Sequence, residues 1–167
     1  MATSVRTGNA GDMHKMFPLV VQQLEERAAV DPGFFALRPN AAERLRQWAG
    51  QALEDPRHAI VVAEVDGELV GCMVVTVEQD LPIYVHDEYA TVRVLWVDPR
   101  HRGKGVAGKM LGHAAEDCRR FGIRQLRACA AVGREIEKHV LKKAGFRAAG
   151  LTFLCDLKPA RKAAASE

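Results

Sequence analysis

A glycine-rich turn between an apolar strand and an amphipathic helix constrains this chain more than any other feature. The turn follows the mostly apolar segment 92–97 and consists of Arg102, Gly103, Lys104, Gly105, Val106, Ala107 and Gly108. Its small residues let the backbone come close to an anion, and the first turn of the helix offers free N–H groups backed by the positive end of the helix dipole. The turn therefore predicts a phosphate-binding site.

Length and composition restrict the class of protein. The chain has 167 residues, of which 48% are apolar and 27% are charged, so we expect one compact domain over residues 1–158 and a frayed tail over 159–167. A net charge of +3 with interleaved acids suits small anionic ligands but neither nucleic acid nor a membrane surface. There is no apolar run of about 18 residues and no signal-peptide pattern, so we expect a cytoplasmic protein.

Cysteines and possible metal ligands are scattered along the sequence. Cys72, Cys118, Cys129 and Cys155 lie far apart in apolar stretches and form no C-x-x-C pair, which predicts plain buried thiols. No His, Asp, Glu or Cys grouping has the spacing of metal ligands, so no bound metal is expected.

Hydrophobic periodicity and turn residues predict the order of the elements. Antiparallel neighbours come first and a strand–helix–strand crossover follows, which predicts an α/β fold: a mixed, mostly antiparallel sheet flanked by helices on both faces. The expected elements are a strand near residue 5, helices over 11–28 and from 41 to before 55, strands over 59–65, 68–77 and 89–97, helices over 106–121 and 134–144 separated by a strand over 123–131, and a last strand or bent pair over 146–157.

Three local signals support these elements. Asn9 or Asp12 can cap the first helix, and Asn40 with Glu43 three residues later predicts a capping box for the second. The dipeptide at 66–67, Asp-Gly, predicts a two-residue hairpin between the second and third strands.

Two common nucleotide-binding motifs fit the glycine turn poorly. Gly103-x-Gly105-x-x-Gly108 matches the dinucleotide fingerprint, but polar or rigid residues at 98–102 separate it from the strand, and the next strand does not end in an acid. A P-loop is excluded because Lys104 lies between the glycines and no Gly-Lys-Ser/Thr follows. A glycine-rich helix start with a basic surface cluster remains as an alternative without function.

The segment around the turn closely resembles the Q/R-x-x-G-x-G/A motif of the GCN5-related N-acetyltransferases. The strand end Leu95-Trp96-Val97, the Asp-Pro pair at 98–99, the basic run, the glycines and the helix occur in the family's order. The resemblance extends to Arg6 and Asp12 near the start, to the Asp-Gly hairpin and to residues 143–146 near the end. It implies the GNAT acyl-CoA N-acyltransferase fold.

The resemblance also implies a coenzyme site. In this family the backbone amides of the turn, here residues 102–108, hold the pyrophosphate of acetyl-CoA, and Arg102 and Lys104 would add positive charge. The pantetheine arm would bond like an extra strand to the backbone of Leu95, Trp96 and Val97. The amide of Val97 is the candidate that polarises the acetyl carbonyl.

Direct acetyl transfer to an amine requires an unprotonated amine and a proton for the departing thiolate. Glu88, acting through water, is the first candidate for the base and His86 the second, because they belong to the nearest group of ionisable residues. The family's tyrosine, which stands four residues before the late glycine, is replaced by Leu141, and Arg134 and Glu137 occupy positions where the family often has Asn and Ala. The source of the proton is thus left open.

Two classes of function follow from the sequence. The first is an acetyl-CoA-dependent N-acetyltransferase that modifies a primary amine of a small molecule or peptide, such as an amino acid, polyamine, aminoglycoside or protein N-terminus. The second is a non-catalytic module that binds or senses acyl-CoA, which Leu141 favours. The acceptor is not encoded in a recognisable motif, and a homodimer through the last strands is left open.

Overall fold

The elements follow one another in the predicted order. The computed structural model describes residues 2–131, 133–150, 152 and 154. In this part of the chain the elements are β1 (Thr3–Thr7), the 3₁₀ turn η1 (Ala10–Asp12), α1 (Met13–Val30), α2 (Ala41–Glu54), β2 (His58–Val65), β3 (Glu68–Gln79), β4 (Glu88–Val97), the 3₁₀ turn η2 (Pro99–His101), α3 (Val106–Arg120), β5 (Leu126–Ala128) and α4 (Glu135–Lys143).

The described strands form one mixed sheet in the order β1-β2-β3-β4-β5. The first four are antiparallel neighbours, and α3 then carries the chain across the sheet so that β5 lies parallel to β4. The parallel pairing is short and joins Ala90–Val92 to Leu126–Ala128. The predicted α/β fold with a mixed, mostly antiparallel sheet is confirmed.

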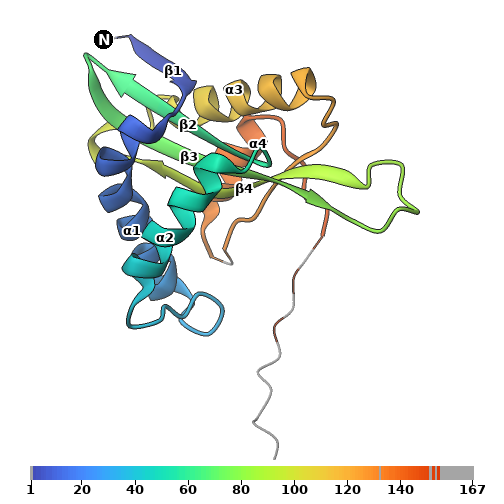
Figure 1. The fold of residues 1–167 in the computed structure, drawn as a ribbon, viewed down its shortest axis with the longest axis horizontal. Coiled ribbons are helices and arrows are strands. Elements are labelled where there is room, and N and C mark those ends of the chain that lie inside the picture. The colour runs from blue at the N-terminus through green and yellow to red at the C-terminus, as the bar shows by residue number, and fades with distance from the viewer. Residues whose placement is uncertain (1, 132, 151, 153, 155–167) are drawn as a thin grey trace, which may run out of the picture.

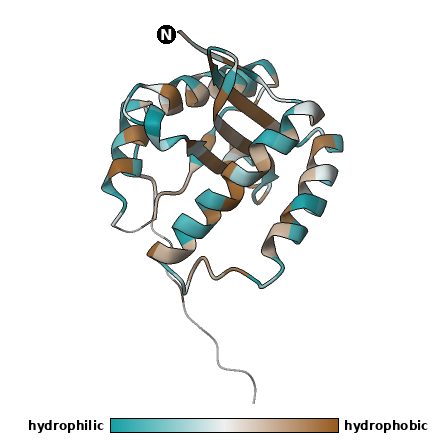
Figure 2. Ribbon diagram, turned by 90° about the vertical axis from the view of Figure 1, so that its left-hand side faces the viewer, coloured by the Kyte–Doolittle hydropathy of each residue, from teal (hydrophilic) through white to brown (hydrophobic). Residues whose placement is uncertain are grey.

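Helices cover both faces of the sheet (Figure 1). On one face α1 and α2 pack over a buried group that includes Met16, Val20 and Trp96, and on the other α3 packs over a group that includes Met73, Val106 and Met110. Figure 2 shows the apolar strands enclosed by helices whose outer faces are hydrophilic. This division follows from the period of 2 in the strands, which sends alternate side chains to opposite cores. Among the described helices, we find none with the length and apolar character needed to cross a bilayer.

The start of the chain is fixed by a charged cluster between β1, η1 and β2. The Arg6 guanidinium lies 2.8 Å from Asp12 Oδ1 and 2.6 Å from Glu64 Oε1. Asp12 also accepts the Asn9 N–H at 2.9 Å, while Asn9 Oδ1 accepts from Gly11, which closes a capping box around η1. The two residues predicted as alternative caps of the first helix thus cap η1 together, whereas Asp12 makes no side-chain cap at the start of α1 itself. The Arg6 guanidinium lowers the pKa of the buried Asp12 carboxyl to about 2.

Other local predictions are confirmed or corrected. The hairpin of β2 and β3 turns at Asp66 and Gly67, whose φ angles of 51° and 81° are those of a two-residue turn. The capping box of α2 is wrong, because Asn40 makes no side-chain cap and Glu43 instead accepts from Arg46 at 3.0 Å.

The end of the fold also differs from expectation. The segment 123–131, predicted as one strand, forms only the short strand β5, and residues 146–150, 152 and 154 do not form the expected last strand. The remainder of 146–157 and the tail lie outside the described residues. Of the cysteines, Cys72 is buried, which raises its thiol pKa to about 12. Cys118 is half-buried and Cys129 is exposed, which corrects the expectation of buried thiols; Cys155 is not among the described residues.

Candidate functional site

The glycine turn forms an open cradle at the N-terminus of α3. Gly103 and Gly105 have φ angles of +76° and +81°, in the left-handed region that favours glycine, and a Cβ built on either would meet nothing within 4 Å. The first backbone hydrogen bond of α3 runs from Lys109 N to Gly105 O at 3.1 Å. The amides of residues 106–108 thus have no partner inside the helix. This is the geometry of an anion site at a helix N-terminus.

The two arginines before the glycines have different partners. Arg100 lies 2.7 Å from Asp98 Oδ2 and 3.3 Å from Glu68 Oε1, and its guanidinium lowers the pKa of the Asp98 carboxyl to about 2. Arg102 instead donates from Nε to Val97 O at 2.9 Å and reaches Glu26 on α1 at 3.4 Å. Arg100, at the Q/R position of the motif, therefore braces the end of β4, and Arg102 is the arginine beside the turn.

A fork opens between β4 and β5 next to this cradle. Their pairing ends at Val92 and Ala128, so β4 has a free edge beyond that point. The carbonyls of Leu95 and Val97 lie on this edge, where they accept from Gln23 Nε2 and Arg102 Nε, both at 2.9 Å.

Trp96 contributes differently from its two neighbours. Because successive residues of a strand direct their backbone groups to opposite sides, those of Trp96 face β3. Its side chain is 3% exposed and packs in the core under α1. The backbone of Leu95 and Val97 is therefore what borders the fork.

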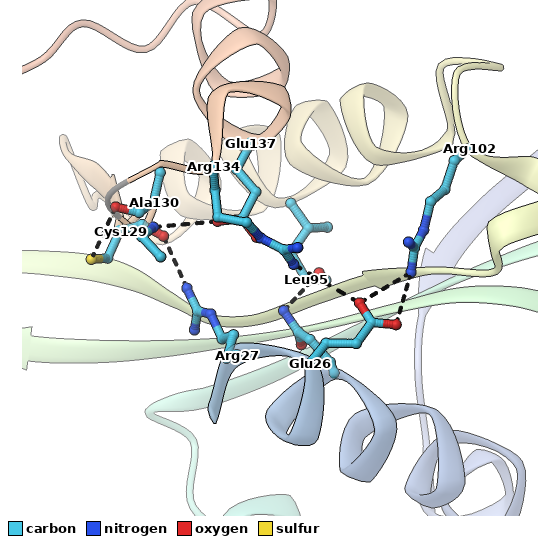
Figure 3. Close-up of polar contacts among 10 residues, drawn as sticks. Glu26, Arg27, Leu95, Arg102, Cys129, Ala130, Arg134 and Glu137 are labelled. Atoms are coloured by element: carbon cyan, nitrogen blue, oxygen red, sulfur yellow. Dashed lines mark hydrogen bonds and ion pairs between the residues drawn. The ribbon is translucent and has the colours of Figure 1, made fainter. Parts of the chain in front are cut away.

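Polar contacts between α1 and α4 cross the fork (Figure 3). Glu26 lies 3.4 Å from Arg102 and 3.9 Å from Arg134, and Arg134 also pairs with Glu137 at 3.0 Å. Arg27 donates to Cys129 O beyond β5 at 3.0 Å. Arg134 and Glu137, which depart from the family's usual residues, are thus part of the polar border of the fork.

The candidate bases lie far from the cradle. Glu88 begins β4 opposite Gln79, and His86 precedes it in the turn of the β3–β4 hairpin, which projects beyond the helices (Figure 1). Glu88 is exposed. Since β4 has 10 residues and a strand rises about 3.3 Å per residue, its two ends are roughly 30 Å apart. The structure thus does not bring these side chains next to the glycine turn.

One group of polar residues was missed in the sequence analysis. Glu78 of β3 pairs in register with Tyr89 of β4, whose hydroxyl lies 3.4 Å from Glu78 Oε2. Arg93 Nη2 lies 2.7 Å from Glu78 Oε1. The strand predicted over 68–77 ends before Glu78, and only the pairing of β3 with β4 and the reach of the Arg93 side chain bring Glu78 together with Tyr89 and Arg93.

Solved structures share this fold. The aminoglycoside acetyltransferase AAC(6')-Iy, in complex with the bisubstrate analogue CoA-S-monomethyl-acetylneamine, is 16% identical with a TM-score of 0.74, covering 95% of this chain and 100% of that one. A predicted acetyltransferase from Clostridium acetobutylicum with acetyl-CoA is 16% identical with a TM-score of 0.75, covering 93% and 96%. An integron cassette protein from the mobile metagenome of Cole Harbour Salt Marsh is 26% identical with a TM-score of 0.69, covering 93% and 91%.

Sequence comparison identifies the family. No curated protein matches the chain, but the model of the acetyltransferase (GNAT) family matches residues 21–146. This match contains the glycine turn, both strands of the fork and the helices α3 and α4. The chain therefore belongs to the acetyltransferase (GNAT) family.

Proposed function

We propose that this protein is an N-acetyltransferase that moves an acetyl group from acetyl-CoA to a primary amine of a small molecule or peptide. The observation that carries the proposal is the glycine cradle at the N-terminus of α3, placed beside the free edge of β4. The family match and the presence of acetyl-CoA or a CoA conjugate in two structures of the same fold support it.

The residues of the cradle fit a pyrophosphate. The amides of Arg102 through Gly108 would hold it, since the turn has an open surface and the amides of residues 106–108 have no partner inside the helix. The Arg102 N–H, which donates to Pro99 O at 3.3 Å, would have to release that contact. Arg102 and Lys104 would add positive charge. Arg102 would have to exchange its Glu26 partner for the phosphate.

The edge of β4 fits the pantetheine arm. Leu95 and Val97 would bond to it with their backbone groups, replacing the Gln23 contact at the Leu95 carbonyl, while Trp96 supports the strand from the core below. The Val97 amide, the candidate from the sequence for polarising the acetyl carbonyl, lies at the cradle end of this edge, so an arm that starts at the cradle and runs along the edge would place the thioester toward Leu95 and the residues before it. When bound, acetyl-CoA supplies a thioester: the amine nitrogen bonds to its carbonyl carbon, the carbon–sulfur bond breaks, and the proton lost by the amine balances the one gained by the thiolate.

Proton removal from the amine is proposed for Glu88 through water, with His86 as the second candidate. Because both side chains lie at or before the start of β4, far from the cradle, either one would need a chain of water molecules to reach the amine. Leu141 packs against the core under α3, so solvent would protonate the thiolate. These roles are tested by the pH dependence of transfer in Glu88→Gln and His86→Asn, in which loss of a base should remove the ascending limb of the profile.

A non-catalytic acyl-CoA module is the second candidate. Leu141, which has no proton to donate, favours it. Thiol release from acetyl-CoA in the presence of a pooled amine library separates the two functions. Release with any amine identifies an enzyme, whereas coenzyme binding without release identifies a binding module.

Gly105→Glu tests the cradle directly. The acidic side chain would stand where the phosphates bind, so we expect acetyl-CoA affinity to fall at least 100-fold in calorimetry. Gly122→Glu is the matched control, because Gly122 follows the other end of α3, has a φ of +80° and also has nothing within 4 Å of a built Cβ. Both variants carry the same backbone strain and charge. Equal affinities in the two variants would refute the proposed coenzyme site.

A further inference from the structure

We propose that Glu78 and Arg93 form the acceptor subsite, and that the acceptor is an amine that also carries a carboxylate. This inference rests on the proposed function, because it assigns the second substrate of the same reaction. Its structural basis is a bulge in β4 where the fork begins, beside which a half-buried carboxylate and a half-exposed guanidinium meet on one face of the sheet.

The bulge lies where β4 leaves β5. Opposite β3, Val92 pairs with Val75 and Val94 with Val74, so Arg93 is the extra residue. The last rung with β5 is also at Val92. The bulge therefore marks the start of the free edge, two residues before Leu95 borders the proposed coenzyme slot.

The bulge also changes which side chains lie on each face. Before it, Ala90 and Val92 enter the core under α3; after it, Val94 and Trp96 enter the core under α1. Tyr89, Thr91 and Arg93 consequently lie on the face that α1 covers further along the strand. Thr76 and Glu78 of β3 share that face, because they alternate with Val75 and Val77 of the other core.

Glu78 offers a place for an ammonium group. Its side chain is 27% exposed, and its Oε1 is excluded from solvent without a hydrogen bond from any described residue, although Arg93 Nη2 is 2.7 Å away. The guanidinium thus neutralises the carboxylate without aiming an N–H at this oxygen. A buried acceptor oxygen in that state gains from a donor that does point at it.

Arg93 would become available when an amine takes its place. Its side chain is 51% exposed, so it can turn away from Glu78 while staying at the fork. A guanidinium with free N–H groups binds a carboxylate in bidentate fashion. An acceptor that carries an ammonium and a carboxylate would therefore replace the Glu78–Arg93 ion pair by two, one with each side chain.

The neighbouring charges exclude a polycation as the preferred acceptor. Arg127 pairs with Asp80 at 3.3 Å and stacks over the Tyr89 ring at 3.4 Å, and Tyr89 in turn contacts Glu78, so these residues border the Glu78–Arg93 pair. Two acids and two arginines give this group no net charge. A polyamine or aminoglycoside would pair with Glu78 but would bring its further cations close to Arg93 and Arg127, and Asp80 is already paired with Arg127.

Matched acceptors test the proposal. The wild-type protein is assayed for thiol release with phenylalanine and phenethylamine, lysine and cadaverine, and histidine and histamine, and with neamine as a polycation. We expect kcat/KM to be at least tenfold higher for the carboxylate-bearing member of the best pair. Calorimetric titration of the same amines into the CoA-saturated protein should show the same preference in Kd, a readout that does not depend on turnover.

Two variants assign the charges. Arg93→Met should abolish the preference within a pair, and Glu78→Gln should lower kcat/KM and affinity for both members at least tenfold. Arg44→Met and Glu54→Gln, exposed positions on α2, should behave like the wild type. Thermal unfolding shows whether each variant is folded. If Glu78→Gln does not fold, the result for Arg93→Met decides the test.

The failures of the two proposals differ. Amines that react without any carboxylate preference, or a preference that survives in Arg93→Met, would overturn the acceptor subsite and leave the transferase standing. Coenzyme binding with no thiol release from any amine would overturn both.

Discussion

At the residue scale, the motif arginines divide two tasks that the sequence does not separate. Arg100 and Arg102 are both basic residues before a glycine, but the turn at Pro99–His101 directs Arg100 back to Asp98 and Arg102 toward the fork. The sequence predicted the glycine cradle because left-handed φ angles leave few other choices. It could not assign the two arginines, since side-chain direction depends on the backbone path of η2.

The division of tasks predicts different effects of removing each guanidinium. Arg102→Ala should weaken acetyl-CoA binding about tenfold, equivalent to about 1.4 kcal/mol, because a charge-assisted contact to the phosphate is lost. Arg100→Ala should leave the affinity within about twofold. Calorimetry at low and high salt measures both, and an equal loss in the two variants would contradict the division.

At the scale of elements, the capped junction of β1 and α1 was predictable and the fork was not. Asn9 and Asp12 carry their capping signal in the local sequence. By contrast, nothing in the segment 123–131 indicates that pairing stops at Ala128, because the end of the pairing depends on β4, whose bulge comes directly after Val92. Glu78 lies just beyond the strand predicted over 68–77, and only the pairing of β3 with β4 joins it to Tyr89 and Arg93.

The junction gives a prediction for stability and its pH dependence. Asp12→Asn should lower the free energy of unfolding by about 1–3 kcal/mol at pH 7, because a buried charged hydrogen-bond partner of Arg6 is lost. Since folding lowers the Asp12 pKa from 3.8 to about 2, its contribution is fully present above pH 3.8 and disappears as the pH falls through 2.

Urea unfolding of wild type and variant from pH 7 to pH 2 measures this contribution. The difference between them should narrow below pH 4, and a difference that stays constant to pH 2 would contradict the role of the ionised carboxylate. Asp66→Asn is the control: this exposed turn position tolerates Asn and should change stability by less than about 0.5 kcal/mol.

At the scale of the whole molecule, two helical layers hold a sheet whose split edge opens beside the start of α3. Element order and the placement of helices on both faces followed from the alternation of periods 2 and 3.6 along the chain. The polar bridge from Glu26 to Arg102 and Arg134 did not, since it joins α1, the turn and α4 across the fork.

Coenzyme binding to this fork should stabilise the entire fold. At an acetyl-CoA concentration 100 times Kd, the added free energy is about 2.7 kcal/mol, which for a chain of this size raises Tm by roughly 5–10 °C. Scanning calorimetry measures the shift. Gly122→Glu should retain it and Gly105→Glu should lose it, whereas a shift of the same size in both variants would place binding elsewhere.

Amide hydrogen exchange at the turn tests the central claim most directly, because the backbone N–H groups of residues 103–108 are the proposed ligands of the pyrophosphate. With saturating CoA we predict that exchange at these amides slows at least tenfold, while the exposed α2 amides near Gly50 change little. Unchanged exchange at 103–108 in protein shown by calorimetry to be saturated would contradict the account.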